Sequence, residues 1–313
     1  MWKRILEYQI TETTLQTKKA NHIHGFLKAH GYSSAVIRHL KETENGICRN
    51  GTWAHIHDPL MPGDMLTIQL TEDTSSQNIL PVPLPLSIVY EDEDLLVIDK
   101  PANMPIHPSQ GNYDNTLANA CAWYFSQKNE PFTYRCINRL DRDTTGLLIL
   151  ARHMYSASLL SAMVARREIH REYRAVVEGL LPECGTVDAP IGRCEGSTIE
   201  REVNVENGEP ARTHFKRLAH TTVPGTGKEY SLAALSLETG RTHQIRVHMK
   251  HIGHPLPGDF LYNPDYSVIG RQALHSYRLT FRHPITGTKM DFRSPLPDDM
   301  VLCHEFREAV SHQ

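Results

Sequence analysis

The sequence offers little that would suit a membrane, secreted or metal-bound protein. No apolar run in its 313 residues is long enough to span a bilayer, and the start, MWKRILEYQITETT, lacks the apolar stretch and small-residue cleavage site of a signal peptide. The six cysteines are scattered without a Cys-x-x-Cys pair, which argues against structural zinc and favours a reducing compartment. We therefore expect a cytoplasmic protein that binds no membrane, and we take it to be a monomer.

An excess of positive charge is also missing. The net charge is -3 at pH 7 with histidines neutral, which does not favour a polyanion as partner. Hydrophobic residues make up an ordinary 40%, which is enough for a sizeable core. Any contact with a nucleic acid must therefore depend on local clusters of basic residues.

The first quarter of the chain has the pattern of a small domain. Residues 20–41 show helical spacing with a break near residue 31, the Asn-Gly pair at 50–51 is a hairpin signal, and residues 65–70 alternate as a strand does. Alternate prolines at 81–85 predict an extended, semi-rigid spacer. We divide the chain into a small α/β domain (1–74), a proline-rich linker (75–87) and a larger body (88–313).

Strands dominate the body, with helices between them. The expected strands cover residues 95–98, 147–150, 171–179 and 229–240, with a hairpin around Thr286-Gly287; the expected helices cover 116–126, 155–164 and the segment THQIRVHMKHIGHP. In that last helix Thr242 can act as the N-cap and Gly253 ends the helix. This order predicts an α+β fold with a mixed, mostly antiparallel sheet.

One stretch, INRLDRDTTGLLILA at residues 137–151, sets four charged residues directly before an apolar strand. Their backbone must lie at the edge of the core, where a carboxylate is partly desolvated and needs a cationic partner. Thr144, Thr145 and Gly146 add hydroxyl and backbone donors on a tight turn. A charged surface loop with a structural ion pair gives the same pattern, so these residues alone leave both interpretations open.

The wider sequence resembles the RluA family of RNA pseudouridine synthases, of the ribosomal large subunit type. The stretch at 137–151 is similar to the family signature of His-Arg-Leu-Asp, two variable residues, Thr-Ser-Gly and an apolar strand. Further similar segments follow in the family's order: LLVIDKPANMPIHP, REYRAVVEG, ETGRTHQIRVHMKHIGHPLPGD and LHSYRLTFRHPITG. The resemblance covers residues 88–297. The departures are Asn138 for the usual His, Asn103 and Asn115 for common glycines, and Glu209 where Lys is frequent.

Residues 1–74 resemble the alpha-L type of RNA-binding domain. The helix pair, the RNG hairpin and the PGD before a strand carry this resemblance. It implies phosphate contacts from basic residues of the domain, namely Lys18, Lys19, Lys28, Arg38, Lys41 and Arg49. Nearby acidic residues dilute this charge, and a purely structural appendage is the alternative.

The resemblance implies an isomerase that converts uridine in structured RNA to pseudouridine, with ribosomal RNA the favoured partner and transfer RNA the second. The reaction moves the ribose C1′ bond from N1 to C5 of the base without a redox change, so it implies no cofactor. A carboxylate beside the sugar either attacks C1′ or takes the C2′ proton, and the matching residue is Asp141. Asp143 is the competing acid, but it occupies a variable position of the motif, which favours a loop acid or a local cap.

Two further catalytic residues follow from the resemblance. Arg246 matches the arginine that keeps the carboxylate ionised, and it lies off the apolar stripe of Ile245 and Met249, so it need not point into the core. Tyr173 matches a tyrosine that stacks on the flipped-out base and places a phenolic oxygen nearby. A tyrosine on an alternating strand is otherwise an ordinary core residue.

The resemblance also implies RNA contacts. Flipping the base costs roughly a few kcal/mol, and Arg139 matches the residue that enters the vacated space. Arg241 is the second choice for the carboxylate's partner and can instead hold a phosphate. His243 and Lys250 extend this local basic patch. We expect no metal, because the spacing of the nearby histidines differs from the i, i+4 pair of a helical zinc site; they are His243, His248, His251 and His254.

Two other classes of function remain open. A catalytically silent RNA-binding protein would share the basic patch without needing Asp141. Another carboxylate enzyme, such as a glycosidase, normally requires two essential acids that flank the bond. The effect of changing Asp143 separates this last class from a synthase with a single reacting carboxylate.

Overall fold

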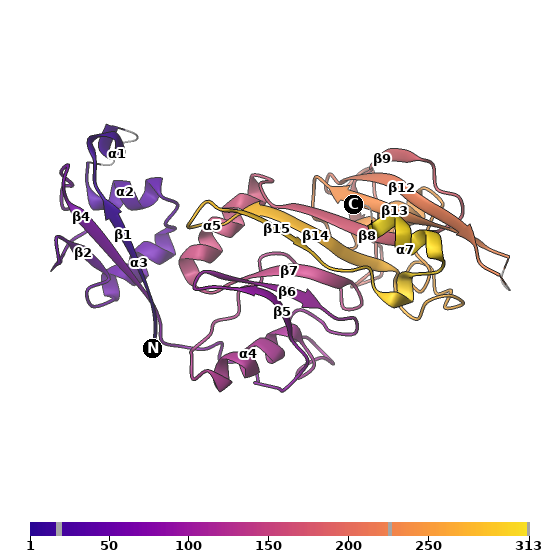
Figure 1. Ribbon diagram of the computed structural model, residues 1–313, viewed down its shortest axis with the longest axis horizontal. Helices are drawn as coiled ribbons and strands as arrows, with labels where there is room; N and C mark the ends of the chain where they lie inside the picture. Colours follow the sequence, from indigo (N-terminus) through magenta and orange to yellow (C-terminus); the bar gives the residue numbers. More distant parts are fainter. Residues whose placement is uncertain (17–20, 225–226, 312–313) are drawn as a thin grey trace.

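The computed structural model describes residues 1–16, 21–224 and 227–311 and shows a small head beside a larger body (Figure 1). None of the helices in these ranges is long and apolar enough to cross a membrane. The head sheet has the order β1-β4-β2-β3, with every neighbouring pair antiparallel. The head elements are β1 (Trp2–Gln9), α1 (Glu12–Gln16), α2 (Ile23–Ala29), α3 (Ser34–Glu42), β2 (Ile47–Arg49), β3 (Thr52–Trp53) and β4 (Met65–Glu72).

The expected helix pair and hairpin of the head are confirmed. Gly31, with a φ of 82°, separates α2 from α3, and Asn50 and Gly51 join β2 to β3 with φ values of 53° and 80°. Positive φ at both central residues is what a type I′ hairpin turn requires. Strand β1 was not predicted, because Leu6 is the only one of its residues that is buried. Its pattern therefore gives no apolar face to recognise.

The body is built on a nine-stranded sheet with the order β5-β6-β7-β14-β8-β13-β12-β9, and β15 also pairs with β14. Among its described strands only β7 and β14 run parallel, so the expected mixed, mostly antiparallel α+β fold is confirmed. The body elements are β5 (Ser87–Glu91), β6 (Leu95–Lys100), α4 (Leu117–Gln127), β7 (Thr145–Ala151), α5 (Met154–Ala165), β8 (His170–Glu178), β9 (Cys184–Asp188), β10 (Ile191–Arg193), β11 (Arg201–Val203), β12 (Arg212–Thr222), β13 (Glu229–Leu237), α6 (Gln244–His251), β14 (Leu274–Arg282), β15 (Lys289–Arg293), a 3-10 turn (Asp298–Met300) and α7 (His304–Ser311).

The parallel pair of β7 and β14 fixes where the charged turn before β7 lies. Gly146 has a φ of 104°, and a Cβ there would lie 2.3 Å from the carbonyl oxygen of Ser276, so only glycine permits this approach. Every residue of β7 is buried. The charged residues just before it therefore emerge at the edge of a fully buried strand.

The segment between head and body is attached to the body. Residues 73–86 hold no helix or strand, but the Val82 amide donates to the Asn119 carbonyl at 3.2 Å, and the Asn119 side chain donates to the Leu80 carbonyl at 2.8 Å. The side chains of Ile79, Leu84 and Leu86 pack on the core of the body. The segment that was predicted as an extended spacer thus lies along the body. The boundaries at 74 and 87 stay predictions.

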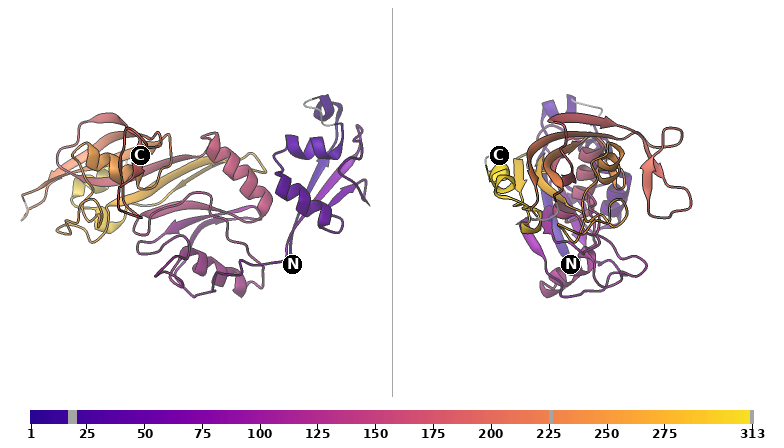
Figure 2. Two further views of the ribbon diagram at one scale, coloured as in Figure 1. Left: turned by 180° about the vertical axis from the view of Figure 1, so that it is seen from behind. Right: turned by 90° about the vertical axis from the view of Figure 1, so that its right-hand side faces the viewer.

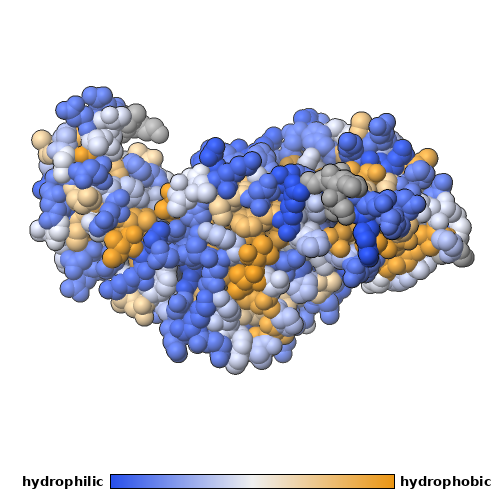
Figure 3. Space-filling view, in the orientation of Figure 1, coloured by the Kyte–Doolittle hydropathy of each residue, from blue (hydrophilic) through white to orange (hydrophobic). Residues whose placement is uncertain are grey.

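Helix α5 supplies part of the contact between the two parts (Figures 1 and 2). The rings of Tyr32 and Tyr155 stack with centroids 3.7 Å apart, and the Tyr155 hydroxyl donates to the His30 carbonyl at 2.8 Å. The space-filling view shows the two parts joined along their facing sides below a notch (Figure 3). The head is thus held against the body by specific polar and aromatic contacts.

Candidate active site

The charged turn before β7 borders a hollow of about 860 Å³. Its walls come from the turn at 137–141, the end of α5, the start of β8 and the segment 236–243 that leads into α6. A smaller pocket of about 60 Å³ shares part of this lining and contains Asp141, Tyr173 and Arg246. Three segments far apart in the sequence thus bring together the three residues predicted as catalytic.

Lys100, at the end of β6, supports the turn from beneath. Its ammonium is buried and donates to the carbonyl oxygens of Pro101, Met104 and Arg142 at 2.7, 3.0 and 2.8 Å. Burial lowers the pKa of Lys100 to about 7, against the charges of Asp143 and Asp141, which raise it. The lysine therefore joins the end of β6 to the turn that carries Asp141.

Arg246 is buried and shared between two carboxylates. It donates to both oxygens of Asp259 at 2.6 and 2.7 Å and to Oδ2 of Asp141 at 2.7 Å. Burial opposes the charge, but these two acids outweigh it and raise the pKa of Arg246. The expectation that Arg246 need not point inward is wrong, because paired carboxylates make the burial of its charge tolerable.

Asp259 was not singled out from the sequence. It is fully buried and also accepts hydrogen bonds from the Leu261 and Tyr262 amides at 3.1 and 3.2 Å. It belongs to the PGD that closes the segment resembling the family's arginine motif, 13 residues after Arg246. A buried arginine implies a second acidic partner, and this reasoning would have pointed to Asp259. The sequence, however, did not indicate that Arg246 is buried.

Asp141 presents one oxygen to the hollow. Its side chain is 28% exposed, and Oδ1 accepts no hydrogen bond from any described residue; Nε2 of His243 lies 4.0 Å from it. The carbonyl of Asp141 accepts from the Thr144 amide at 3.1 Å, which fixes the turn. One oxygen is therefore bound to Arg246, while the other can meet a substrate.

His243 is held by Tyr262. The Tyr262 hydroxyl accepts from the Arg201 amide at 2.9 Å and lies 2.9 Å from Nδ1 of His243. Burial is the main cause that lowers the pKa of His243. A neutral ring whose Nδ1 accepts the tyrosine hydrogen carries its own hydrogen on Nε2, the atom that faces Asp141.

The expected cap of α6 is wrong. The helix begins at Gln244, and His243 precedes it with a φ of 57° and no side-chain cap. The Gln244 side-chain oxygen instead accepts from the Arg241 amide at 3.0 Å and from the Thr239 hydroxyl at 2.8 Å. Gly253, with a φ of 83°, does follow the helix end as predicted.

The predicted RNA-binding residues fall into two groups. Arg139, Arg241 and His243 line the large hollow. Lys250 lies outside its lining, on the exposed side of α6, with Nζ 5.4 Å from the Tyr262 ring. Arg241 also forms an ion pair with Glu209, the residue that stands where Lys is frequent in the family.

Asp143 faces another direction. Its Oδ1 accepts from the Asn103 amide at 3.1 Å, and its Oδ2 accepts from Arg142 at 2.9 and 3.0 Å. It lines neither the hollow nor the smaller pocket. Its carboxylate therefore ties the turn at Asn103, which has a φ of 55°, to the turn that carries Asp141.

Two other histidines near α6 have structural contacts. His248 is fully buried between the Thr213 hydroxyl and the Ala189 carbonyl, both at 2.9 Å. Nδ1 of His254 lies 2.8 Å from the Glu178 carbonyl. These two are packed residues, and His243 is the one histidine of this run that reaches the hollow in the described chain.

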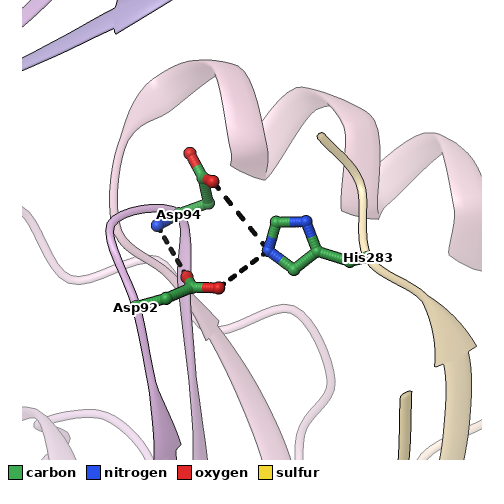
Figure 4. A group of neighbouring side chains, drawn as sticks. All are labelled: Asp92, Asp94 and His283. Atoms are coloured by element: carbon green, nitrogen blue, oxygen red, sulfur yellow. Dashed lines mark hydrogen bonds and ion pairs between the residues drawn. The ribbon is translucent and has the colours of Figure 1, made fainter. Parts of the chain in front are cut away.

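A second charged cluster lies where the head meets the body. Asp92, Asp94 and His283 converge closely enough to hold a metal ion (Figure 4). Nδ1 of His283 accepts from the Thr286 amide, and Nε2 of His283 lies 2.9 Å from Oδ2 of Asp92. Arg4 donates to both oxygens of Asp94, at 3.1 and 3.2 Å. Internal partners thus account for the charges of this group without a metal.

The described basic residues of the head show no comparable site. Lys28 donates to the Ser34 hydroxyl, and Arg49 donates to the Pro59 carbonyl. Lys18 and Lys19 lie outside the described residues. RNA binding by the head therefore stays a prediction.

A comparison with known families identifies the class. The model described as RNA pseudouridylate synthase matches residues 94–251, which include the turn of Asp141, β8 and α6. The chain belongs to this family, whose members are isomerases that act on RNA. The sequence resemblance to such enzymes is confirmed.

Individual relatives are similar over most of the chain. An uncharacterized RNA pseudouridine synthase of Bacillus subtilis, YjbO, is 41% identical over 271 residues, which cover 86% of this chain and 93% of that protein. Ribosomal large subunit pseudouridine synthase D of Escherichia coli O6:H1 is 41% identical over 243 residues, 73% of this chain and 72% of that protein. The structure of human RNA pseudouridylate synthase domain containing 1 matches with a TM-score of 0.57 and 27% identity, over 67% of this chain and 83% of that chain.

Proposed function

We propose that this protein converts specific uridines of large-subunit ribosomal RNA to pseudouridine, with Asp141 as the reacting carboxylate. The observation that carries the proposal is the division of labour between the two oxygens of Asp141. Oδ2 is bound to the buried Arg246, while Oδ1 is open to the hollow. The ion pair orients the carboxylate, so that Oδ1 faces the space that the sugar would occupy.

The chemistry balances without a cofactor. The C1′–N1 bond breaks and a C1′–C5 bond forms, while C5 loses a proton and N1 gains one. Asp141 either attacks C1′ and leaves when C5 attacks, or takes the C2′ proton and returns it. Both routes need one ionised carboxylate beside the ribose and a base that can turn between the two bonds.

Other residues of the hollow take positions that suit this reaction. Tyr173, on β8 in the smaller pocket, stacks on the flipped base and places its phenol near C5. Arg139 enters the space that the base vacates. His243 and Arg241 contact the RNA within the hollow, and Lys250 contacts it from the exposed side of α6, outside the hollow.

The names of the relatives support ribosomal RNA as the substrate. Ribosomal large subunit pseudouridine synthases D from several bacteria are 38–41% identical to this chain. Transfer RNA is the second candidate. We further propose that the enzyme is a cytoplasmic monomer and that its head, which resembles an alpha-L domain, adds RNA contacts.

The geometry favours this function over the other two classes. A silent RNA-binding protein has no need for an oriented carboxylate with a free oxygen. A glycosidase needs a second acid aimed at the same bond, and the other acids in the lining of the hollow are engaged by arginines. Glu172 pairs with Arg278 at 3.3 Å, and Glu238 pairs with Arg167 at 3.1 Å.

Tritium release from RNA labelled at uridine C5 tests the proposal. Wild type and Asp141→Asn would be compared on ribosomal and transfer RNA from cells that lack this protein. We expect release from ribosomal RNA by the wild type alone. Equal release by both proteins would show that Asp141 is not the reacting group. RNA binding by the wild type without tritium release would favour a catalytically silent RNA-binding protein.

A further inference from the structure

Four arginines line the large hollow, and they differ in their partners. They are Arg139, Arg167, Arg171 and Arg241. Arg167 donates to Glu238 at 3.1 Å, and Arg241 forms an ion pair with Glu209. An arginine whose charge is already neutralised gains less from a phosphate than one whose charge is not.

Arg171 has no such acidic partner. Among the described residues, its side chain forms no hydrogen bond or ion pair, although it is only partly exposed. Its guanidinium crosses the hollow to the turn before α6, where Nη2 lies 3.6 Å from the place a Cβ would take on Gly240. The absence of a side chain at Gly240 leaves this guanidinium room beside the backbone.

Arg171 also has a defined position relative to the reacting pocket. It precedes Tyr173 by two residues on β8, so the two side chains lie on the same face of the strand, roughly 7 Å apart along it. Tyr173 shares its pocket with Asp141. Arg171 therefore lies in the same hollow as the expected position of the reacting base, two residues along β8 from Tyr173.

We propose that Arg171 binds a backbone phosphate beside the flipped uridine. This inference rests on the proposed function and adds a residue that holds the substrate. A free guanidinium offers two parallel N–H donors to a phosphate, which a lysine cannot reproduce. The neighbouring Glu172 does not compete for it, because it pairs with Arg278 and Arg174.

The test compares Arg171→Ala, Arg171→Lys and a matched control, Arg166→Ala, on a transcript of large-subunit ribosomal RNA. Arg166 lies just beyond α5, pairs with Glu168 and does not line the hollow. We expect Arg171→Ala to raise KM about tenfold with kcat nearly unchanged, and to reduce the slope of log affinity against log salt by about one. Arg171→Lys should restore the slope but only part of the affinity.

The outcomes separate this inference from the proposed function. Wild-type KM and salt slope in Arg171→Ala, with tritium release intact, would overturn the role of Arg171 alone. An equal loss in Arg166→Ala would also overturn it, because the effect would then be one of general charge. Wild-type protein that binds the transcript but releases no tritium would instead overturn the proposed function.

Discussion

Two aspartate–arginine pairs in this molecule have similar components and different surroundings. Asp141 accepts from Arg246 at 2.7 Å at the wall of the hollow, and Asp94 accepts from Arg4 at 3.1 and 3.2 Å between body and head. A histidine accompanies each aspartate: Nε2 of His243 is 4.0 Å from Asp141, and that of His153 is 3.0 Å from Asp94.

The difference lies in what remains free on each carboxylate. Asp94 is 3% exposed, and both of its oxygens accept hydrogen bonds, so its role is to join Arg4 of the head to His153 of the body. Asp141 is 28% exposed and keeps Oδ1 open. Asp259 contributes to this by accepting from Nε and Nη2 of Arg246, so the arginine stays buried beside Asp141. An ion pair thus indicates a reactive carboxylate only when one oxygen of that carboxylate stays free and faces a space large enough for a substrate.

The largest loss of stability is expected from Arg246→Met. It removes the cation between two carboxylates and leaves Asp259 buried without a cationic partner, so we expect about 3–5 kcal/mol less free energy of unfolding. Turnover per folded molecule should fall at least about 100-fold, because Asp141 loses its orientation. Urea titration and tritium release measure the two effects. Wild-type stability would show that Asp259 does not need Arg246.

Asp94→Asn should separate stability from chemistry at the other pair. Removing the charge weakens the bonds from Arg4 and His153, at a cost of about 1–3 kcal/mol, while turnover of folded protein changes little. The control is Asp73→Asn, which removes an exposed charge near the same junction. A large loss of turnover in folded Asp94→Asn would mean that the head contact shapes the hollow.

The same pair predicts a dependence on pH. Burial disfavours the charge of Asp94, but hydrogen bonds from His153 and Arg4 outweigh it and lower the pKa of this carboxyl below its ordinary 3.8. A lowered pKa gives stability that is present above about pH 4 and lost as the pH falls further. The rate at which a protease cleaves the segment between head and body should rise in the wild type as the pH is lowered. This dependence on pH should be smaller in Asp94→Asn.

Glu209→Gln should increase the positive charge that the hollow offers to RNA. It frees Arg241 for a phosphate, so we expect RNA affinity to rise about twofold to fivefold at low salt, with stability nearly unchanged. Glu206→Gln is the control, since it removes the same charge from an exposed position nearby. An equal rise in both variants would trace the effect to net charge instead of to Arg241.

The smallest effect is expected from Asp143→Asn. This carboxylate faces Asn103 and Arg142, away from the hollow, so turnover should stay within about threefold and stability should drop by about 1 kcal/mol. Single-turnover rates beside those of Asp141→Asn decide the point. Comparable losses in the two would restore a mechanism with two essential acids.

Local sequence patterns predicted those elements that show a clear apolar run or a turn signal within their own residues. The apolar runs of β6 and β7 and the Asn50-Gly51 turn are such cases. Strands β1 and β12 have few buried residues. Hydrogen bonds to partner strands hold them in place more than the burial of an apolar face does. Their pairing depends on residues far away in the chain, which no local pattern contains.

The site was predictable as a set of residues and less so as a geometry. Resemblance indicated Asp141, Tyr173 and Arg246, and the fold brings them to one pocket. The burial of Arg246 could not be read from its helix, because it depends on Asp259, which folds back from beyond the helix end. The unpaired state of Arg171 likewise depends on where the acids of other strands find their own arginines.

Turnover and stability of Asp141→Asn and Asp94→Asn, measured side by side, test the central claim most directly. The account predicts that Asp141→Asn loses tritium release at least about 1,000-fold with nearly unchanged stability and RNA binding. It predicts that Asp94→Asn loses stability and keeps the activity of its folded fraction. Substantial release by Asp141→Asn, or loss of activity in folded Asp94→Asn alone, would contradict the division of roles between the two pairs.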